Sequence, residues 1–255
     1  MLINLEGKVG LIVGVANDHS IAWGCAKKMH DCKAKLAITY GSEKTKKYTQ
    51  PLIETLNCPI FLPGNVENQE EIQKVFTAIE KEWGKLDFLV HSIAFAPQQD
   101  LHGRVVDCSK EGFLKAMHIS CYSLIQLSKL AEPLMKQGGS ILTLSYYGSQ
   151  KVIKNYNLMG IAKAALESTV RYLAHDLGTA NIRVNAISPG PVMTRAASGI
   201  SDFKELLDTA IQKSALHRGI NIDSVGNLAA FLSSDLGQDI SGEVLYVDAG
   251  YSIMG

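Results

Sequence analysis

The sequence predicts an α/β domain in which helices cover both faces of a parallel β-sheet. Two observations support this prediction. Short apolar runs bounded by glycine or proline alternate with longer segments of helical period, and continuous apolar runs are typical of strands that are buried on both faces. No repeat, low-complexity tract or linker divides the 255 residues, so we expect residues 1–255 to form one domain.

Seven apolar runs are the candidate strands. They are residues 9–16, 35–40, 59–64, 86–94, 139–146, 182–188 and 243–250. Segments of helical period cover residues 20–31, 43–56, 68–83, 109–136, 155–178 and 223–235. Strands and helices repeated in this order predict a doubly wound parallel sheet of about seven strands. In such a sheet, ligands bind beyond the carboxyl ends of the strands.

The composition narrows the possible functions. Lys and Arg number 25 and are balanced by 25 Asp and Glu, which disfavours nucleic acid and anionic membranes as partners. No apolar stretch approaches the roughly 18 residues of a membrane span. The five cysteines are odd in number and show no CxxC spacing, which predicts reduced thiols and a cytoplasmic protein. His91, His118 and His175 share no metal-ligand spacing, so we expect no metal site.

The turn after the first strand has features of a phosphate site. It reads GVANDHSIAWG, with small residues at Gly14 and Ala16 and a serine, Ser20, where a helix should begin. The free N–H groups and the dipole at a helix start favour a phosphate. We expect Gly24 to let this helix pack close to the strand. An ordinary helix cap after a turn is the alternative interpretation.

The end of the second strand, TYGSEKTKK, is where a dinucleotide fold meets the adenosine ribose. An acid here favours NAD and an arginine favours NADP, but Tyr40 and Gly41 are neither. Glu43 favours NAD, whereas the lysines within residues 44–47 favour NADP or form a solvated helix face. These residues alone leave the choice open.

Two later strand ends also carry unusual residues. HSIAFAP, residues 91–97, has small residues at Ser92 and Ala94 that allow a ribose or a nicotinamide to approach the backbone. SPGPVMTR, residues 188–195, has two prolines and a glycine and leads into small residues. A rigid turn before such a segment predicts a substrate lid near residues 192–212, the alternative being an ordinary connection.

The pair Tyr156 and Lys163 has the spacing expected of a catalytic site on a helix. Seven residues of helix turn through about 700°, so the two side chains lie within roughly 20° of each other and about 10 Å apart along the axis. A ribose fits against both groups, and a nearby lysine is expected to lower the pKa of the phenol. With Tyr146 ten residues earlier, the pair predicts a hydride-transfer site.

These motifs, together with RVNAISPGP and SGEVLYVDAG, resemble the short-chain dehydrogenase/reductase superfamily, whose domain is Rossmann-like. Most of that superfamily uses Tyr-x3-Lys. The spacing Tyr-x6-Lys with a tyrosine ten residues before it is similar to that of the bacterial NADH-dependent enoyl-[acyl-carrier-protein] reductases of type II fatty acid synthesis. The chain departs from their usual pattern at Asn65, Pro189 and Arg195.

The resemblance implies a reaction and a set of site residues. NADH would deliver hydride to the β-carbon of a trans-2-enoyl thioester on acyl carrier protein, within a homotetramer. Tyr156 would stabilise the enolate, Tyr146 would orient the thioester carbonyl and Lys163 would hold the nicotinamide ribose. Ala96 would contact the acyl group. The cofactor contacts it implies are Gly14, Ser20, Ile21, Gly41, Asn65, Val66, Ile93, Lys163, Val192, Met193, Thr194, Arg195 and Ala196.

Two other functions fit parts of the sequence. Tyr147 and Lys151 form a Tyr-x3-Lys pair that would suggest a carbonyl reductase, but Gly148 places this pair in a turn, where positions i and i+4 need not share a face. A dinucleotide-sensing regulator that has lost the chemistry is the other alternative.

The helices expected at 109–136 and 155–178 carry more apolar residues than one sheet face can bury, which predicts subunit contacts. These residues are Leu124, Ile125, Leu127, Leu130, Leu166, Val170, Tyr172 and Leu173.

Overall fold

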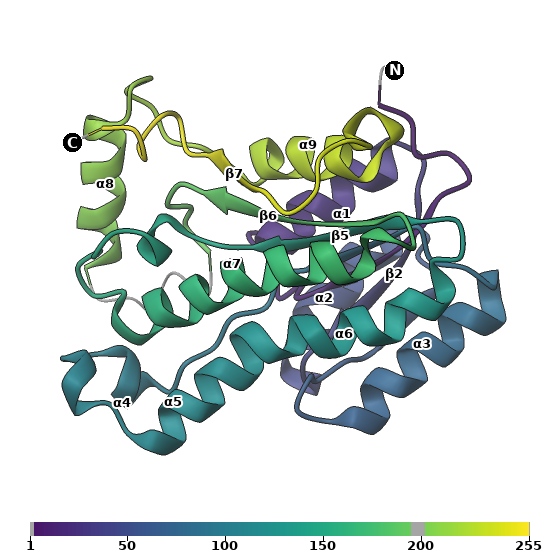
Figure 1. The fold of residues 1–255 in the computed structure, drawn as a ribbon, viewed down its shortest axis with the longest axis horizontal. Coiled ribbons are helices and arrows are strands. Elements are labelled where there is room, and N and C mark those ends of the chain that lie inside the picture. The colour runs from purple at the N-terminus through teal and green to yellow at the C-terminus, as the bar shows by residue number, and fades with distance from the viewer. Residues whose placement is uncertain (1–2, 195–201, 255) are drawn as a thin grey trace.

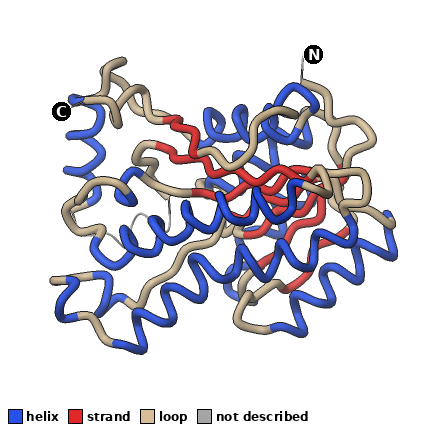
Figure 2. Tube along the Cα trace, in the orientation of Figure 1, coloured by secondary structure: helices blue, strands red, loops and turns tan. Residues whose placement is uncertain are grey.

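A computed structural model describes residues 3–194 and 202–254. Its centre is a seven-stranded sheet in the order β3-β2-β1-β4-β5-β6-β7. Every neighbouring pair of strands is parallel, and helices lie above and below the sheet in Figures 1 and 2. The predicted Rossmann-like, doubly wound parallel sheet is therefore confirmed.

Each predicted apolar run contains one strand. The strands are β1 Val9–Val13, β2 Lys35–Tyr40, β3 Ile60–Pro63, β4 Phe88–His91, β5 Gly139–Leu144, β6 Ile182–Pro189 and β7 Val244–Val247. The central strands β1 and β4 are buried along their whole length, as expected for strands with helices on both sides. Leu11 of β1 lies opposite Ala37 of β2 and Leu89 of β4, so apolar side chains meet across the middle of the sheet.

The described residues form nine α-helices. They are α1 Ile21–Asp31, α2 Glu43–Thr55, α3 Gln69–Trp83, α4 Gln98–Leu101, α5 Lys110–Met117, α6 Ser123–Ala131, α7 Asn157–Gly178, α8 Phe203–Lys213 and α9 Ile222–Ser233. The single helix expected at 109–136 is interrupted, because a π-helical turn, His118–Tyr122, separates α5 from α6. Helices α4 and α8 were not predicted from the sequence.

The core has two layers, one on each face of the sheet. Helices α3, α6 and α7 pack on one face, where Phe76, Leu124 and Leu166 are buried. Helices α1, α2 and α9 cover the other face, where Met29 and Val225 are buried. Each such side chain contributes roughly 1.5–3 kcal/mol by leaving water, so the two layers hold the strand ends in fixed positions. Within the described residues, no helix has both the length and the apolar character needed to cross a membrane.

Gly24 was predicted to let α1 pack close to a strand, and that prediction is wrong about the element that α1 contacts. A Cβ at Gly24 would overlap the backbone carbonyl of Ile222 at the start of α9, and a Cβ at Gly226 would overlap the carbonyl oxygen of Gly24. The two glycines therefore allow α1 and α9 to approach each other closely. The close contact is between helices and not between α1 and a strand.

Candidate active site

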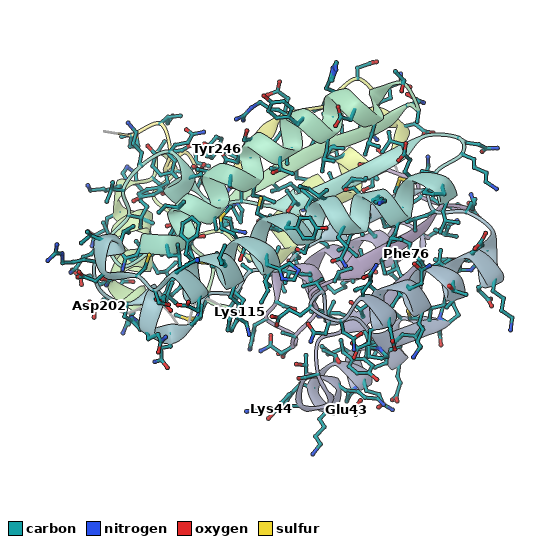
Figure 3. All side chains as sticks on the ribbon, turned by 60° about the horizontal axis from the view of Figure 1, so that its bottom comes forward. Glu43, Lys44, Phe76, Lys115, Asp202 and Tyr246 are labelled. Carbon is teal, nitrogen blue, oxygen red and sulfur yellow. The ribbon has the colours of Figure 1, made fainter. Side chains whose placement is uncertain are left out.

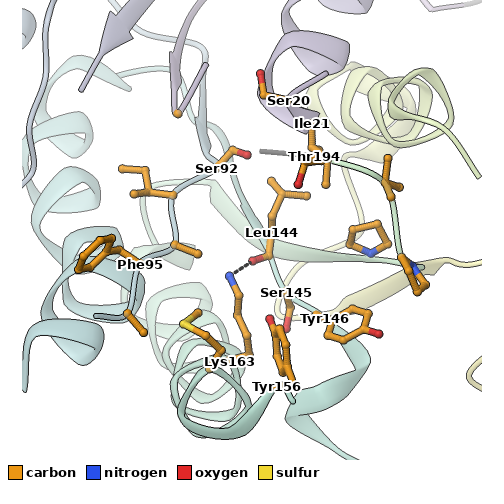
Figure 4. A pocket seen from close by; sticks show the side chains of 18 of the residues that line it. Ser20, Ile21, Ser92, Phe95, Leu144, Ser145, Tyr146, Tyr156, Lys163 and Thr194 are labelled. Carbon is orange, nitrogen blue, oxygen red and sulfur yellow. Dashed lines mark hydrogen bonds between the residues drawn. The ribbon is translucent and has the colours of Figure 1, made fainter. Parts of the chain in front are cut away.

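A cavity of about 590 Å³ opens at the carboxyl ends of the central strands, where a doubly wound sheet binds its ligands. Residues that follow β1, β4, β5 and β6 line it, as Ser92, Tyr146 and Thr194 do in Figure 4. Residues of α7 and α8 also belong to the lining. The cavity therefore gathers segments that are far apart in the sequence. Its lining includes Gly14, Ser20, Ile21, Ile93, Ala96, Tyr146, Tyr156, Lys163, Val192 and Thr194.

The three predicted catalytic side chains lie together on one wall. Tyr156 occupies the N-cap position of α7, one residue before the helix begins, and Lys163 lies within the helix; both side chains line the cavity. The rings of Tyr146 and Tyr156 meet edge to face, with centroids 4.7 Å apart. The hydroxyl of Tyr146 is buried and has no hydrogen-bond partner within residues 3–194 and 202–254. It is available to donate to a group bound in the cavity.

Lys163 is held by the end of β5. Its Nζ donates a hydrogen bond to the backbone carbonyl oxygen of Leu144, 2.6 Å away, as Figure 4 shows. Burial lowers the pKa of Lys163 to about 8, while the nearby Cys121 and Glu167 act in the opposite direction. The ammonium form therefore persists at neutral pH in an apolar surrounding, where its charge acts strongly on any neighbouring group.

The expectation that Lys163 lowers the pKa of the Tyr156 phenol is wrong for this structure. Burial raises the pKa of Tyr156 well above its ordinary value, and the neighbouring Tyr146 and Glu167 raise it further. Burial also raises the pKa of Tyr146, with a smaller contribution from Tyr251. Both phenols are therefore neutral at physiological pH, and each can donate a hydrogen bond.

The turn after β1 has the geometry of a phosphate site. Gly14 has a φ of +113°, and a Cβ there would overlap the carbonyl oxygen of Ser92, so only glycine fits. Ser20 stands at the N-cap of α1 as expected, yet its side chain makes no cap hydrogen bond and instead donates to the carbonyl of Asn17 at 2.7 Å. The first turn of α1 carries no acidic residue, so its positive end is suited to an anion.

The residues predicted to meet adenosine lie outside the cavity lining. Gly41 is exposed, with open space where a Cβ would stand, and Val66 is buried. The backbone N–H of Asn65 donates to Glu71 at 2.9 Å. Glu43 and Lys44 project from the start of α2 in Figure 3, and both are exposed.

The last predicted cofactor contacts have different outcomes. Val192 and Thr194 line the cavity. Met193 is half exposed and is not part of the lining. Arg195 and Ala196 lie outside the described residues.

Sequence reasoning missed much of the apolar lining. Phe95, Leu101, Met159, Phe203 and Leu206 all face the cavity. Phe203 and Leu206 come from α8, within the expected lid segment. Their spacing of three residues is typical of the apolar face of an amphipathic helix and could have predicted that they face the cavity. Leu101 lies in the short α4, which has too few residues to show a period.

The competing pair Tyr147 and Lys151 does not form a site. Tyr147 lies in a 3₁₀ turn, Tyr147–Ser149, and its ring packs edge to face on those of Tyr246 and Tyr251. Lys151 is exposed, and neither residue lines the cavity.

Comparisons with known proteins show the family of this chain. A family model described as enoyl-(acyl carrier protein) reductase matches residues 14–252. The enoyl-[acyl-carrier-protein] reductase [NADH] of Nostoc sp. is 50% identical over the full length of both chains. The Rickettsia typhi enzyme of the same name is 49% identical, over 98% of this chain and 96% of its own.

Solved structures give the same result. The reductase from Anaplasma phagocytophilum in complex with NAD is 51% identical, with a TM-score of 0.95, and the match covers 100% of this chain and 97% of that one. The enoyl-[acyl-carrier-protein] reductase (NADH) of Aquifex aeolicus is 48% identical, also with a TM-score of 0.95, over 98% and 99% of the two chains. This chain therefore belongs to the enoyl-(acyl carrier protein) reductase family.

Proposed function

We propose that this chain is an NADH-dependent reductase of trans-2-enoyl thioesters carried by acyl carrier protein, and that it serves type II fatty acid synthesis. The main support for this proposal is that Tyr146, Tyr156 and Lys163 lie together in the lining of the cavity. The relatives support NADH and the carrier-bound substrate, because their names state both.

The residues of the cavity fit a dinucleotide. Gly14 leaves room that a Cβ would fill, and the adjacent start of α1 suits a pyrophosphate. Lys163 reaches into the cavity from α7 and would hold the nicotinamide ribose hydroxyls. Ile93 and Thr194 would flank the nicotinamide. NADH, when bound, supplies the hydride for the β-carbon of the substrate.

At the adenosine end, Gly41, Asn65 and Val66 would complete the cofactor site. Their positions at the ends of β2 and β3 support this assignment, because those ends lie on the same edge of the parallel sheet as the cavity.

The proposed roles of the tyrosines follow from where charge develops. Reduction of a conjugated double bond places negative charge on the thioester oxygen, one conjugated unit away from the carbon that accepts hydride. A neutral Tyr156 phenol would donate a hydrogen bond to that oxygen. Tyr146, whose hydroxyl has no partner in the described residues, would orient the same carbonyl. Ala96 would contact the acyl group, and the ammonium of Lys163 would add positive charge nearby.

Further proposals concern the assembly. We expect residues 1–255 to be a single short-chain reductase domain that works as a homotetramer in the cytoplasm. None of the five cysteines forms a disulfide, which is consistent with a reducing compartment. Part of the expected lid near 192–212 is the helix α8, which supplies Phe203 and Leu206 to the cavity.

Absorbance of NADH and of NADPH, followed separately with a trans-2-enoyl thioester, tests the function. We expect oxidation with NADH in the wild type. Lys163→Met should raise KM for NADH and lower kcat/KM by about a hundredfold or more. Tyr156→Phe should lower kcat by about a hundredfold or more, as for loss of one oxyanion donor. If a ketone is reduced and the enoyl thioester is not, the proposed reaction is wrong.

A further inference from the structure

Glu167 is a buried carboxylate that the reaction described above does not use. It is 5% exposed and lies on α7, four residues beyond Lys163. One oxygen, Oε1, accepts hydrogen bonds from the hydroxyls of Ser145 at 2.5 Å and Ser149 at 2.6 Å. Both bonds are short for O–H···O hydrogen bonds, so this side chain is a firm point of attachment for the two serines.

The two serines belong to the segment that carries Tyr146. Ser145 directly follows β5 and separates Leu144 from Tyr146 in Figure 4. Three consecutive residues thus contact α7: the Leu144 carbonyl accepts from Lys163, Ser145 donates to Glu167, and the Tyr146 ring packs on that of Tyr156. Along this segment, the residue that contacts Glu167 lies between the two residues that contact Lys163 and Tyr156.

The turn that follows lies directly on the helix. A Cβ at Gly160 of α7 would stand 2.8 Å from the carbonyl oxygen of Gly148, and a Cβ at Gly148 would overlap the ring of Tyr156. Because the backbones approach this closely, the hydrogen bonds of Ser145 and Ser149 act across a narrow contact. A displacement of this turn would therefore disturb groups that touch Tyr156.

We propose that Glu167 is a positioning residue for the reduction: by binding Ser145 and Ser149 it holds the end of β5 against α7 and fixes Tyr146 relative to Tyr156 and Lys163. This inference rests on the catalytic roles proposed above for those three residues. Catalytic groups must stay within about 0.5 Å of their productive positions, and supporting hydrogen bonds provide that precision.

Two substitutions at Glu167 test the proposal. Glu167→Gln keeps an oxygen that can accept from both serines, whereas Glu167→Leu has a similar volume and no acceptor. We expect Glu167→Leu to lower kcat for a trans-2-enoyl thioester by about ten- to a hundredfold, the effect of a small misplacement. KM for NADH should change less than about twofold, and Glu167→Gln should retain kcat within about threefold of the wild type.

The outcomes distinguish the positioning role of Glu167 from the proposed function of the chain. Wild-type kcat in Glu167→Leu, or an equal loss in Glu167→Gln, overturns the positioning role. A wild-type protein that does not consume the enoyl thioester with NADH overturns the proposed function instead.

If thermal unfolding shows that Glu167→Leu does not fold, a second pair of variants tests the positioning role of Glu167. Ser145→Ala removes one donor to Glu167 and should lower kcat severalfold. Ser188→Ala is its matched control, because Ser188 is equally buried at the end of β6 and its hydroxyl has no hydrogen-bond partner in the described part of the chain. Equal kcat values for Ser145→Ala and Ser188→Ala would overturn the proposal.

Discussion

Lys163 is proposed above to act in catalysis, and its burial lowers the stability of the fold. Its native pKa of about 8 is below the ordinary value of 10.5, so the folded chain loses this proton at a lower pH than the unfolded chain. Between these two values the unfolded state binds more protons, and the free energy of unfolding therefore rises with pH. Below pH 8 the buried ammonium weakens the fold that surrounds it.

A comparison of the wild type with Lys163→Met measures this effect. As the pH rises from about 7.5 to 10.5, we expect the free energy of unfolding of the wild type to increase relative to the variant by roughly 3 kcal/mol, the equivalent of the shift in pKa. Denaturant titrations at several pH values provide the numbers, and titrating groups that do not interact with Lys163 cancel in the difference. A difference that does not depend on pH would show that the pKa of Lys163 is not lowered.

The sequence predicted where the proposed catalytic side chains lie but not how they ionise. The positions of Tyr156 and Lys163 follow from helical geometry, and Tyr146 and Ser20 follow from the ends of strands. The direction of the phenol pKa shift depends on burial, which arises from packing between segments distant in sequence. The Ser20 side chain turns to Asn17 instead of capping α1, and this local choice also had no signature in the sequence.

At the scale of elements, the contact between α1 and α9 depends on the absence of two side chains. A Cβ at Gly24 would meet backbone atoms of Ile222, which cannot move without displacing α9. We expect Gly24→Ala to lower the free energy of unfolding by about 1–3 kcal/mol, as for other overpacked positions. Urea denaturation gives the value.

Gly178→Ala is the matched control for that substitution. Gly178 ends α7, and a Cβ there meets nothing within 4 Å. Alanine should therefore stabilise the protein by about 0.5–1 kcal/mol, because it restricts the unfolded chain and favours the helix. Equal effects of the two substitutions would contradict a specific role for Gly24.

The strands were easier to predict than the interruption between α5 and α6. Continuous apolar runs marked all seven strands, and at the centre of the sheet they reflect burial on both faces. The π-helical turn has no such pattern, since it is fixed by tertiary contacts. Ser120 within it both accepts from the N–H of Phe95 and donates to its carbonyl. His91 of β4 bonds to Ser123, where α6 begins.

At the scale of the whole molecule, the helices on one face of the sheet carry apolar side chains that the sheet does not cover. The prediction from their composition was too broad, because Leu124, Leu127, Leu166 and Val170 are buried against the sheet. Exposed apolar residues nevertheless remain on or between α5, α6 and α7. They are Leu114, Tyr122, Ile125, Ile161 and Tyr172.

Tyr172 is 71% exposed and offers a test of the proposed homotetramer. We expect Tyr172→Glu to shift the protein toward smaller species, because a charge at the centre of an apolar contact is left without a partner. Sedimentation velocity over a range of concentrations measures the shift. Tyr48→Glu, at an exposed tyrosine of α2, is the control, and an unchanged mass for Tyr172→Glu would place the subunit contacts elsewhere.

The strand order β3-β2-β1-β4-β5-β6-β7 also has a consequence for the time course of folding. Every strand pair is parallel, so each pair requires a crossover connection. Strand β1 can pair with β4 only after the segment between them has folded back. Contacts between distant parts of a chain form slowly, because the intervening loop must close first. The cavity is lined by residues that follow four different strands, β1, β4, β5 and β6. During refolding, the cavity is therefore completed only after most of the secondary structure has formed.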